Sequence, residues 1–88
     1  MVIQGENNMR TELCDFMVAC EVRLKEQDEN KGPKGWIHNS TTGLTVRLSK
    51  NLEDLANVET RDEYLSALKD IANYAMMLYD RDVKGLKQ

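Results

Sequence analysis

The stretch TRDEYLSALKDIANYAMMLY, residues 60–79, decides the fold class. Its first four residues form a capping box, in which the Thr60 hydroxyl and the Glu63 carboxylate can each accept from the other residue's backbone N–H. Apolar residues then recur at spacings of three and four, the period of a helix with one apolar face. These residues are Leu65, Leu68, Ala72, Ala75 and Tyr79, flanked by Ile71, Met76 and Leu78. We expect this helix to stop at Gly85.

A second helix is predicted upstream, from Ser40–Thr42 to about Ala56. Its apolar stripe consists of Leu44, Leu48, Leu52 and Leu55, and Val46 lies to the side. Gly43 weakens the first turn and leaves the exact start open. The joint LANVET is short, so this helix and the one after Thr60 should form a helical hairpin.

A third amphipathic segment occupies the N-terminal part of the chain. We expect it to run from near Asn8 to about Glu29, with Asn7 or Asn8 as its N-cap. Its stripe consists of Met9, Leu13, Phe16, Met17, Cys20 and Leu24. The opposite, polar face should carry Glu12, Asp15, Arg23 and Glu26. Gly32 and Pro33 end the helix.

Three such helices predict an all-α protomer that forms one domain over residues 1–88, with 1–7 and 85–88 frayed. A chain of 88 residues buries a small share of its surface, and this one has a single Phe and a single Trp for its core. We therefore expect a homodimer or a higher homo-oligomer to complete the helical bundle.

The charge and composition of the chain argue against some classes of function. The net charge of −3 and the pI of about 5.1 argue against general binding to nucleic acid. We expect no signal peptide and no membrane span, because no apolar run approaches the required length. Cys14 and Cys20 lie six residues apart on one helix, too far for a bridge, so both should be reduced thiols and small apolar groups in a cytoplasmic protein.

The stretch NKGPKGWIHNS, residues 30–40, interrupts the helices. Its glycines let backbone N–H groups approach a phosphate, Lys31 and Lys34 supply positive charge, and Trp36 can stack on a base. The alternative is a helix-breaking loop whose Trp36 plugs the open end of the core. We favour a ligand loop, because a passive linker needs neither the indole nor the lysines. His38 has no metal-ligand partners in the sequence and fits a loop or capping role.

Three stretches follow one another in the chain: FMVACEVRLKEQDENKGPKGW, LTVRLSKNLEDL and LKDIANYAMMLYD. In this order they resemble the short phage and bacterial members of the MazG-type family. These are all-α nucleoside triphosphate pyrophosphohydrolases. The resemblance covers about residues 13–80 and implies a lysine-glycine-tryptophan loop near the nucleotide. It also implies Mg²⁺ ions, held by Glu-Glu-x-x-Glu and Glu-x-x-Asp motifs, that activate a water for cleavage between the α and β phosphates.

The family's first acidic motif falls on Lys50, Asn51 and Asp54, with Glu53 adjacent. Two of its three carboxylates are therefore replaced, and the third is one methylene shorter. Lys50 places a positive charge about where a metal would lie. It can pair with Asp54 four residues along the helix, or contact a ligand phosphate in place of the lost cation.

In the second motif the glutamate position is Ala67, while Asp70 and the following Asn73 are kept. Asp54 and Asp70 are thus the candidate catalytic and metal-binding residues, and one weak Mg²⁺ site could remain on them. The alternative is a polar inner face left over from an ancestral site. The candidate nucleotide-binding residues are Lys31, Lys34, Trp36, Lys50 and Asn73.

Three functions are consistent with the resemblance and with the altered acidic motifs. The first is a MazG-like nucleotide-binding protein with lost or weakened hydrolysis, for example a phage protein that captures a nucleotide signal. The second is weak Mg²⁺-dependent pyrophosphohydrolysis of nucleoside triphosphates. The third is a protein-interaction module whose old site is vestigial.

Overall fold

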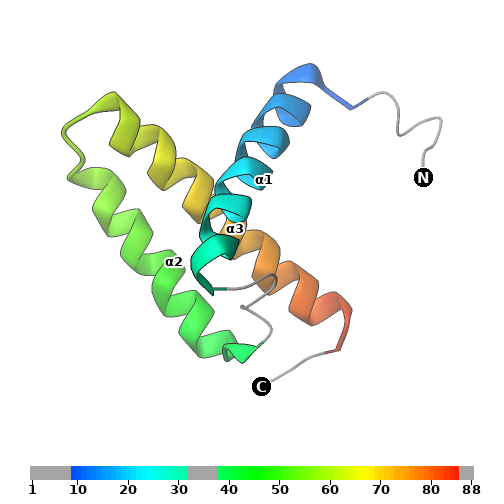
Figure 1. Ribbon diagram of the computed structural model, residues 1–88. Helices are drawn as coiled ribbons and strands as arrows, with labels where there is room; N and C mark the ends of the chain where they lie inside the picture. Colours follow the sequence, from blue (N-terminus) through cyan, green and yellow to red (C-terminus); the bar gives the residue numbers. More distant parts are fainter. Residues whose placement is uncertain (1–8, 32–37, 86–88) are drawn as a thin grey trace.

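The computed structural model describes residues 9–31 and 38–85, with side chains over 9–28 and 38–85. This part of the chain contains α1 (Thr11–Lys31), α2 (Thr41–Ala56) and α3 (Arg61–Val83), and it has no strand (Figure 1). The prediction of an all-α chain with three helices is confirmed. None of the described helices has the length and apolar character that crossing a bilayer needs.

The start of α3 shows which part of the capping box forms. The Thr60 hydroxyl accepts from the Glu63 backbone N–H at 3.1 Å, as predicted. The Glu63 carboxylate, however, accepts from the backbone N–H of Glu59 at 3.1 Å, not from that of Thr60. The predicted partner of the Glu63 carboxylate is therefore wrong by one residue, because the carboxylate passes Thr60 and binds the backbone N–H of Glu59. At the other end Gly85 has a φ of +75°, in agreement with the predicted stop.

The start of α2 is set by Ser40, whose side chain accepts from the Gly43 backbone N–H at 2.9 Å. A Cβ at residue 43 would lie 3.2 Å from that hydroxyl oxygen. Gly43 therefore leaves room for the cap, at the cost of helix propensity. The helix ends at Ala56, as predicted, and Asn57 caps it.

The first helix begins at Thr11, three residues later than predicted, and continues to Lys31. The Arg10 carbonyl accepts from the backbone N–H groups of Leu13 and Cys14, which places Arg10 at the helix start. The predicted caps, Asn7 and Asn8, lie outside the described residues. A cap at Asn8 would have made Met9 the first helical residue, whereas the helix begins at Thr11.

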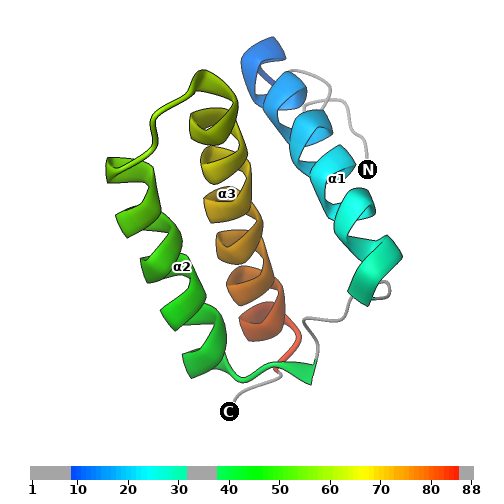
Figure 2. The ribbon, with the colours of Figure 1, turned by 60° about the vertical axis from the view of Figure 1, so that its left-hand side comes forward.

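The three helices do not lie side by side along their whole lengths. Helices α2 and α3 form the predicted antiparallel hairpin, with a connection at residues 57–60 (Figures 1 and 2). Helix α1 packs against α3, which it crosses with its C-terminal half, and its N-terminal half projects past the hairpin (Figure 1).

This arrangement leaves much of the predicted stripe of α1 uncovered. Cys20 is buried, but Met9, Leu13, Phe16 and Met17 are each 38–46% exposed. The prediction that the whole stripe faces one core is wrong for this N-terminal half. The reason is geometric: none of the described helices lies beneath the half of α1 that projects past α3 (Figure 1).

The interior is small. Among the described residues the buried apolar side chains are Cys20, Leu44, Ala67 and Met77, and Leu44 is fully enclosed. Leu44 lies on the predicted stripe of α2, and Val46 is 61% exposed, as its place beside that stripe indicates. Leu52, at the edge of the stripe, is 52% exposed, which departs from the prediction.

Helix α3 turns an unexpected face inward. Its buried residues are Ala67, Asn73, Met77 and Arg81. The predicted apolar stripe instead leaves Leu65 40% and Tyr79 73% exposed. At 3.6 residues per turn, Asn73, Met77 and Arg81 lie opposite that stripe. The expectation that the apolar stripe of α3 packs inside the protomer is therefore only partly met.

We expect Thr60→Ala to lower the free energy of unfolding by about 1 kcal/mol, because the Glu63 N–H loses the acceptor that caps α3. Urea titration followed by circular dichroism measures this. Thr42→Ala, an exposed threonine in the first turn of α2, is the matched control and should change stability by less than about 0.5 kcal/mol. Equal effects of the two substitutions would show that the Thr60 cap contributes nothing specific.

Candidate functional site

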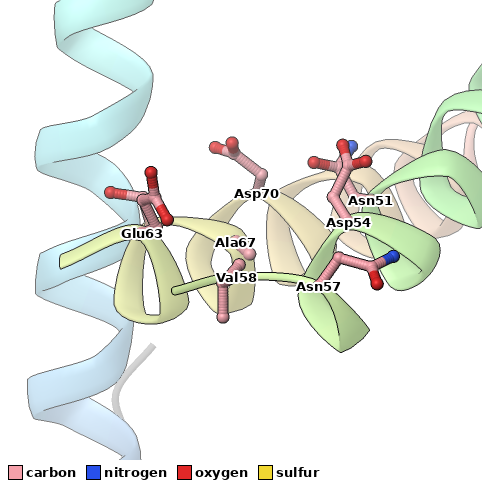
Figure 3. A pocket seen from close by; sticks show the side chains of 8 residues that line it. Asn51, Asp54, Asn57, Val58, Glu63, Ala67 and Asp70 are labelled. Atoms are coloured by element: carbon pink, nitrogen blue, oxygen red, sulfur yellow. The ribbon is translucent and has the colours of Figure 1, made fainter. Parts of the chain in front are cut away.

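Two hollows lie along the α2–α3 hairpin. The first, which we call the acidic pocket, has a volume of about 400 Å³. It is lined by Asn51, Asp54, Asn57, Val58, Glu63, Ser66, Ala67 and Asp70. The carboxylates of Asp54, Glu63 and Asp70 point to the same side of the hairpin (Figure 3). The structure thus brings both candidate catalytic residues to one pocket, and it adds Asn51 and Glu63 from the same two helices and Asn57 from their connection.

Each carboxylate of the acidic pocket already has a partner. Asp54 accepts from the Lys50 ammonium at 3.4 Å, the pair that the sequence predicts. Glu63 accepts from the backbone N–H of Glu59. Asp70 accepts from Arg23, which donates through Nε at 2.8 Å and through Nη2 at 3.1 Å. The negative charges of the two aspartates are therefore balanced within the chain.

This balance bears on the Mg²⁺ expectation. A Mg²⁺ ion needs several oxygen ligands that converge in near-octahedral geometry. Within residues 9–28 and 38–85, no three His, Cys, Asp or Glu side chains gather closely enough to hold a metal ion. Asp54 and Asp70 would have to exchange their basic partners for the ion. As arranged, this donor set does not fit a two-metal centre.

Arg23 is one of the residues near the site that the sequence did not predict. We expected it on the polar face of α1, yet it reaches across to α3 and holds Asp70 with two parallel hydrogen bonds. Its side chain is 30% exposed and that of Asp70 is 17% exposed. The hydrogen bond to Asp70 raises the pKa of Arg23 above its ordinary value, so the guanidinium stays charged. Its place at the edge of the α1 stripe, three residues after Cys20, could have shown that Arg23 approaches a neighbouring helix, although not which residue it binds.

Asn73, a candidate nucleotide contact, lies inside the protomer. It is buried, and its amide Nδ2 donates to the backbone carbonyl of Cys20 on α1 at 3.2 Å. Burial raises the pKa of the Cys20 thiol, which therefore stays protonated at neutral pH. Together with Arg23 and Asp70, this polar contact forms the seam between α1 and α3. Asn73 serves that seam and is not part of either hollow.

The second hollow, which we call the basic pocket, adjoins the first and has a volume of about 440 Å³. It is lined by Val46, Arg47, Lys50, Asn51 and Tyr74. Lys50 is a predicted nucleotide contact, whereas Arg47 and Tyr74 were not singled out. Arg47 precedes Lys50 by three residues on α2 and so shares its face, which is the signal that could have found it. Asn51 borders both pockets.

The remaining candidates belong to the segment between α1 and α2. Lys34 and Trp36 lie outside the described residues, and so does the side chain of Lys31, whose backbone ends α1. Their predicted contact with a ligand stays a prediction. His38 is exposed and lies shortly before Ser40, the cap of α2.

A scan against protein-family models and searches of curated proteins and of solved structures found no match for this chain. The MazG resemblance therefore rests on the residues quoted above.

We expect Asp70→Asn to lower the free energy of unfolding by about 1–3 kcal/mol, because it removes the hydrogen-bonded anion of the half-buried Arg23 guanidinium, whose contact with Glu26 is longer, at 3.9 Å. The matched control is Asp54→Asn, which breaks an exposed pair by the same chemical change and should cost less than about 1 kcal/mol. Both are measured by urea denaturation. A loss at Asp70 no larger than that at Asp54 would contradict a structural role for the Arg23 contact.

Proposed function

We propose that this chain is a MazG-like nucleotide-binding protein that has lost or weakened metal-dependent hydrolysis. The observation that supports this most directly is the basic pocket, where Arg47 and Lys50 of α2 and Tyr74 of α3 line one hollow. Two cations and an aromatic ring are the side chains that phosphates and a nucleobase require. The pocket adjoins the carboxylates that correspond to the family's metal ligands, so one ligand could span both hollows.

Lys50 is free to change partners. Its pair with Asp54 is exposed, with side-chain exposures of 68% and 53%, and is held by one long hydrogen bond of 3.4 Å. Such a pair contributes less than about 1 kcal/mol to stability. A phosphate with two negative charges offers Lys50 a stronger interaction. We therefore assign Lys50 and Arg47 to the phosphates of the ligand.

Tyr74 supplies the aromatic surface. Its side chain lines the basic pocket from α3 and is half-buried, so its ring is held in place and still accessible. Stacking of a base on such a ring contributes about 1–3 kcal/mol and tolerates different bases. A ligand that reaches from Tyr74 to Arg47 and Lys50 matches a nucleoside with a phosphate chain.

The same geometry disfavours catalysis. The family reaction needs Mg²⁺ to bridge the triphosphate and activate a water. Here Asp70 is held by Arg23 at 2.8 Å, and Asp54 faces Lys50. Positive side chains thus lie where the family places its cations, and they can neutralise a phosphate without activating water. Capture of a nucleotide signal by a phage protein in a host cytoplasm is a role that needs binding alone.

Specific observations also support the other two functions, weak hydrolysis and protein interaction. Weak Mg²⁺-dependent hydrolysis requires Asp54 and Asp70, which do border one pocket. An interaction module is supported by the uncovered apolar residues of α1. We also propose that the chain acts as a homodimer or higher homo-oligomer, since its small interior leaves large apolar side chains exposed.

Calorimetric titration against mono-, tri- and cyclic nucleotides tests the proposal. We expect binding without Mg²⁺ and no pyrophosphate release above a heat-inactivated control. Lys50→Ala should weaken binding about tenfold, since a charged hydrogen bond is worth about 1.5 kcal/mol or more. Lys84→Ala is the matched control, because Lys84 also pairs with an aspartate four residues away, Asp80, but lies in neither pocket. Absence of binding to all three nucleotide classes would reject the proposal, and Mg²⁺-dependent pyrophosphate release would favour the enzyme.

Trp36→Ala tests the loop separately. If the indole stacks on the base, this variant should lose about 1–3 kcal/mol of nucleotide affinity with little change in melting temperature. Calorimetry and a thermal melt on the same sample measure both quantities. A sharp drop in melting temperature with unchanged affinity per folded molecule would instead identify Trp36 as a plug of the core.

A further inference from the structure

The polar side chains that α2 contributes to the two pockets follow one another along one face of this helix. Arg47 and Lys50 line the basic pocket, and Asp54 lines the acidic pocket (Figure 3). Asn51 lies between them in the sequence and lines both pockets. Asp54 comes about two turns after Arg47, or roughly 10 Å further along the helix axis. A ligand whose phosphate is held at Arg47 can therefore extend past Asn51 to Asp54.

The amide of Asn51 shows which chemical groups fit the boundary between the pockets. Its Nδ2 donates to the backbone carbonyl of Arg47 at 2.8 Å, so the helix itself engages the amide nitrogen. The Oδ1 atom remains to accept from a ligand. The Asp54 carboxylate, next along the same face, is also an acceptor. A ligand group that lies at this boundary must therefore donate hydrogen bonds.

Binding of a phosphate changes the surroundings of Asp54. In the free protein the Lys50 ammonium lies 3.4 Å from this carboxylate. When Lys50 moves to the phosphate of a bound nucleotide, Asp54 loses that partner. A ligand that places hydrogen-bond donors on Asp54 compensates for the loss, whereas a ligand that places an acceptor there adds repulsion. The exchange at Lys50 thus makes Asp54 sensitive to the chemistry of the ligand.

The base of the nucleotide lies close to this boundary. Tyr74 lines the basic pocket from α3, and Asp70, one turn earlier on the same helix, lines the acidic pocket. A base that stacks on the Tyr74 ring therefore has its edge near Asn51 and Asp54. Stacking tolerates every base, so the ring alone selects none of them. Selection depends on the groups that the edge of the base presents.

Guanine is the base whose edge fits two neighbouring acceptor oxygens. Its N1–H and N2 amino groups are adjacent donors, which match the two oxygens of a carboxylate. Adenine and cytosine present one amino group beside a ring nitrogen that accepts. Uracil presents one N–H between two carbonyls. Each of these three bases would place at least one acceptor against the carboxylate.

We propose that the ligand of the two pockets is a guanine nucleotide, whose N1–H and N2 amino groups donate to the Asp54 carboxylate. Its base lies on the Tyr74 ring, and its phosphates are held by Arg47 and Lys50. This assignment rests on the proposed nucleotide binding and adds the identity of the base. It gives Asp54 a role that needs no metal ion, since the same carboxylate determines which base fits.

The exposure of Asp54 sets the size of the selectivity. A bidentate contact to the edge of a base discriminates against the wrong base by roughly ten- to a hundredfold. The Asp54 side chain is 53% exposed, so water also solvates it when the wrong base is bound. We therefore expect a preference of about tenfold, at the lower end of that range.

Calorimetric titration of the protein with the triphosphates of guanosine, inosine and adenosine, without Mg²⁺, measures this preference. Guanosine triphosphate should bind about tenfold more tightly than adenosine triphosphate. Inosine triphosphate, which keeps N1–H and lacks the N2 amino group, should lie between them. The 2′-deoxy form of guanosine triphosphate should bind as tightly as the ribose form, because the contact is made to the base.

Asp54→Asn tests the contact itself and keeps the fold, since the pair that it breaks is exposed. An amide donor then opposes the N2 amino group of guanine and matches the carbonyl that xanthine carries in its place. The variant should lose the preference for guanine over adenine and should prefer xanthosine triphosphate to guanosine triphosphate. The ratio between two nucleotides is compared, because a change at Lys50 affects all triphosphates alike.

Asp80→Asn is the matched control. Asp80 also pairs with a lysine four residues away, Lys84, and it lines neither pocket. This variant should keep the guanine preference of the unmodified protein.

Equal binding of all bases overturns the assignment of guanine and leaves nucleotide binding intact. A guanine preference that persists in Asp54→Asn, or a variant that does not prefer xanthosine triphosphate, overturns the contact with Asp54. Discrimination between ribose and deoxyribose without discrimination among bases also overturns it, and places Asp54 at the sugar. Absence of binding by every nucleotide rejects the proposed function and the choice of base together.

Discussion

Arg23 reaches from α1 to Asp70 on α3 with two hydrogen bonds of 2.8 and 3.1 Å, and the packing of α1 depends on this contact. Next to it, the Asn73 amide donates to the Cys20 carbonyl. These polar contacts orient α3 so that Ala67, Asn73, Met77 and Arg81 face inward. Burying Arg23 and Asp70 costs less free energy than burying fully enclosed charges, because both side chains keep some access to water. Their two parallel hydrogen bonds also pair the guanidinium donors with the carboxylate oxygens. The orientation of α3 then decides what its other half can do.

The contact between Arg23 and Asp70 first bears on metal binding and hydrolysis. The resemblance to the MazG-type family places Asp70 on the one acidic position of the second motif that is kept, and a guanidinium engages this carboxylate. A carboxylate cannot keep two such hydrogen bonds and also offer the same oxygens to Mg²⁺. Lys50, which the same resemblance places on a glutamate position of the first motif, pairs with Asp54. At both aspartates a positive side chain thus lies where the resemblance implies a metal ion, which suits the proposed retention of an anion better than hydrolysis.

Local signals predicted more than long-range ones. The Thr60 cap, the helix end at Ala56 and the Lys50–Asp54 pair depend on residues within four positions of one another, and the structure has all three. The partner of Arg23 lies 47 residues away, and nothing in the period of α1 specifies it. Periodicity also could not tell which half of α3 faces inward, because an apolar stripe has the same spacing whether it packs inside a protomer or against another copy. Arg47 and Tyr74 were missed for a similar reason: they become neighbours only when the hairpin closes.

The division of α3 into a polar inner half and an apolar outer half separates two possible tasks. The acidic and basic pockets open on the side shared by α2 and the polar half of α3. Tyr79 and Leu65 lie on the other side of that helix. A partner that covered Leu65 and Tyr79 would therefore leave both pockets open to solvent. It would also stabilise α3, on which Tyr74 and Asp70 are fixed, and so hold the lining of the pockets in place. Assembly and ligand capture can thus reinforce each other without sharing a single residue.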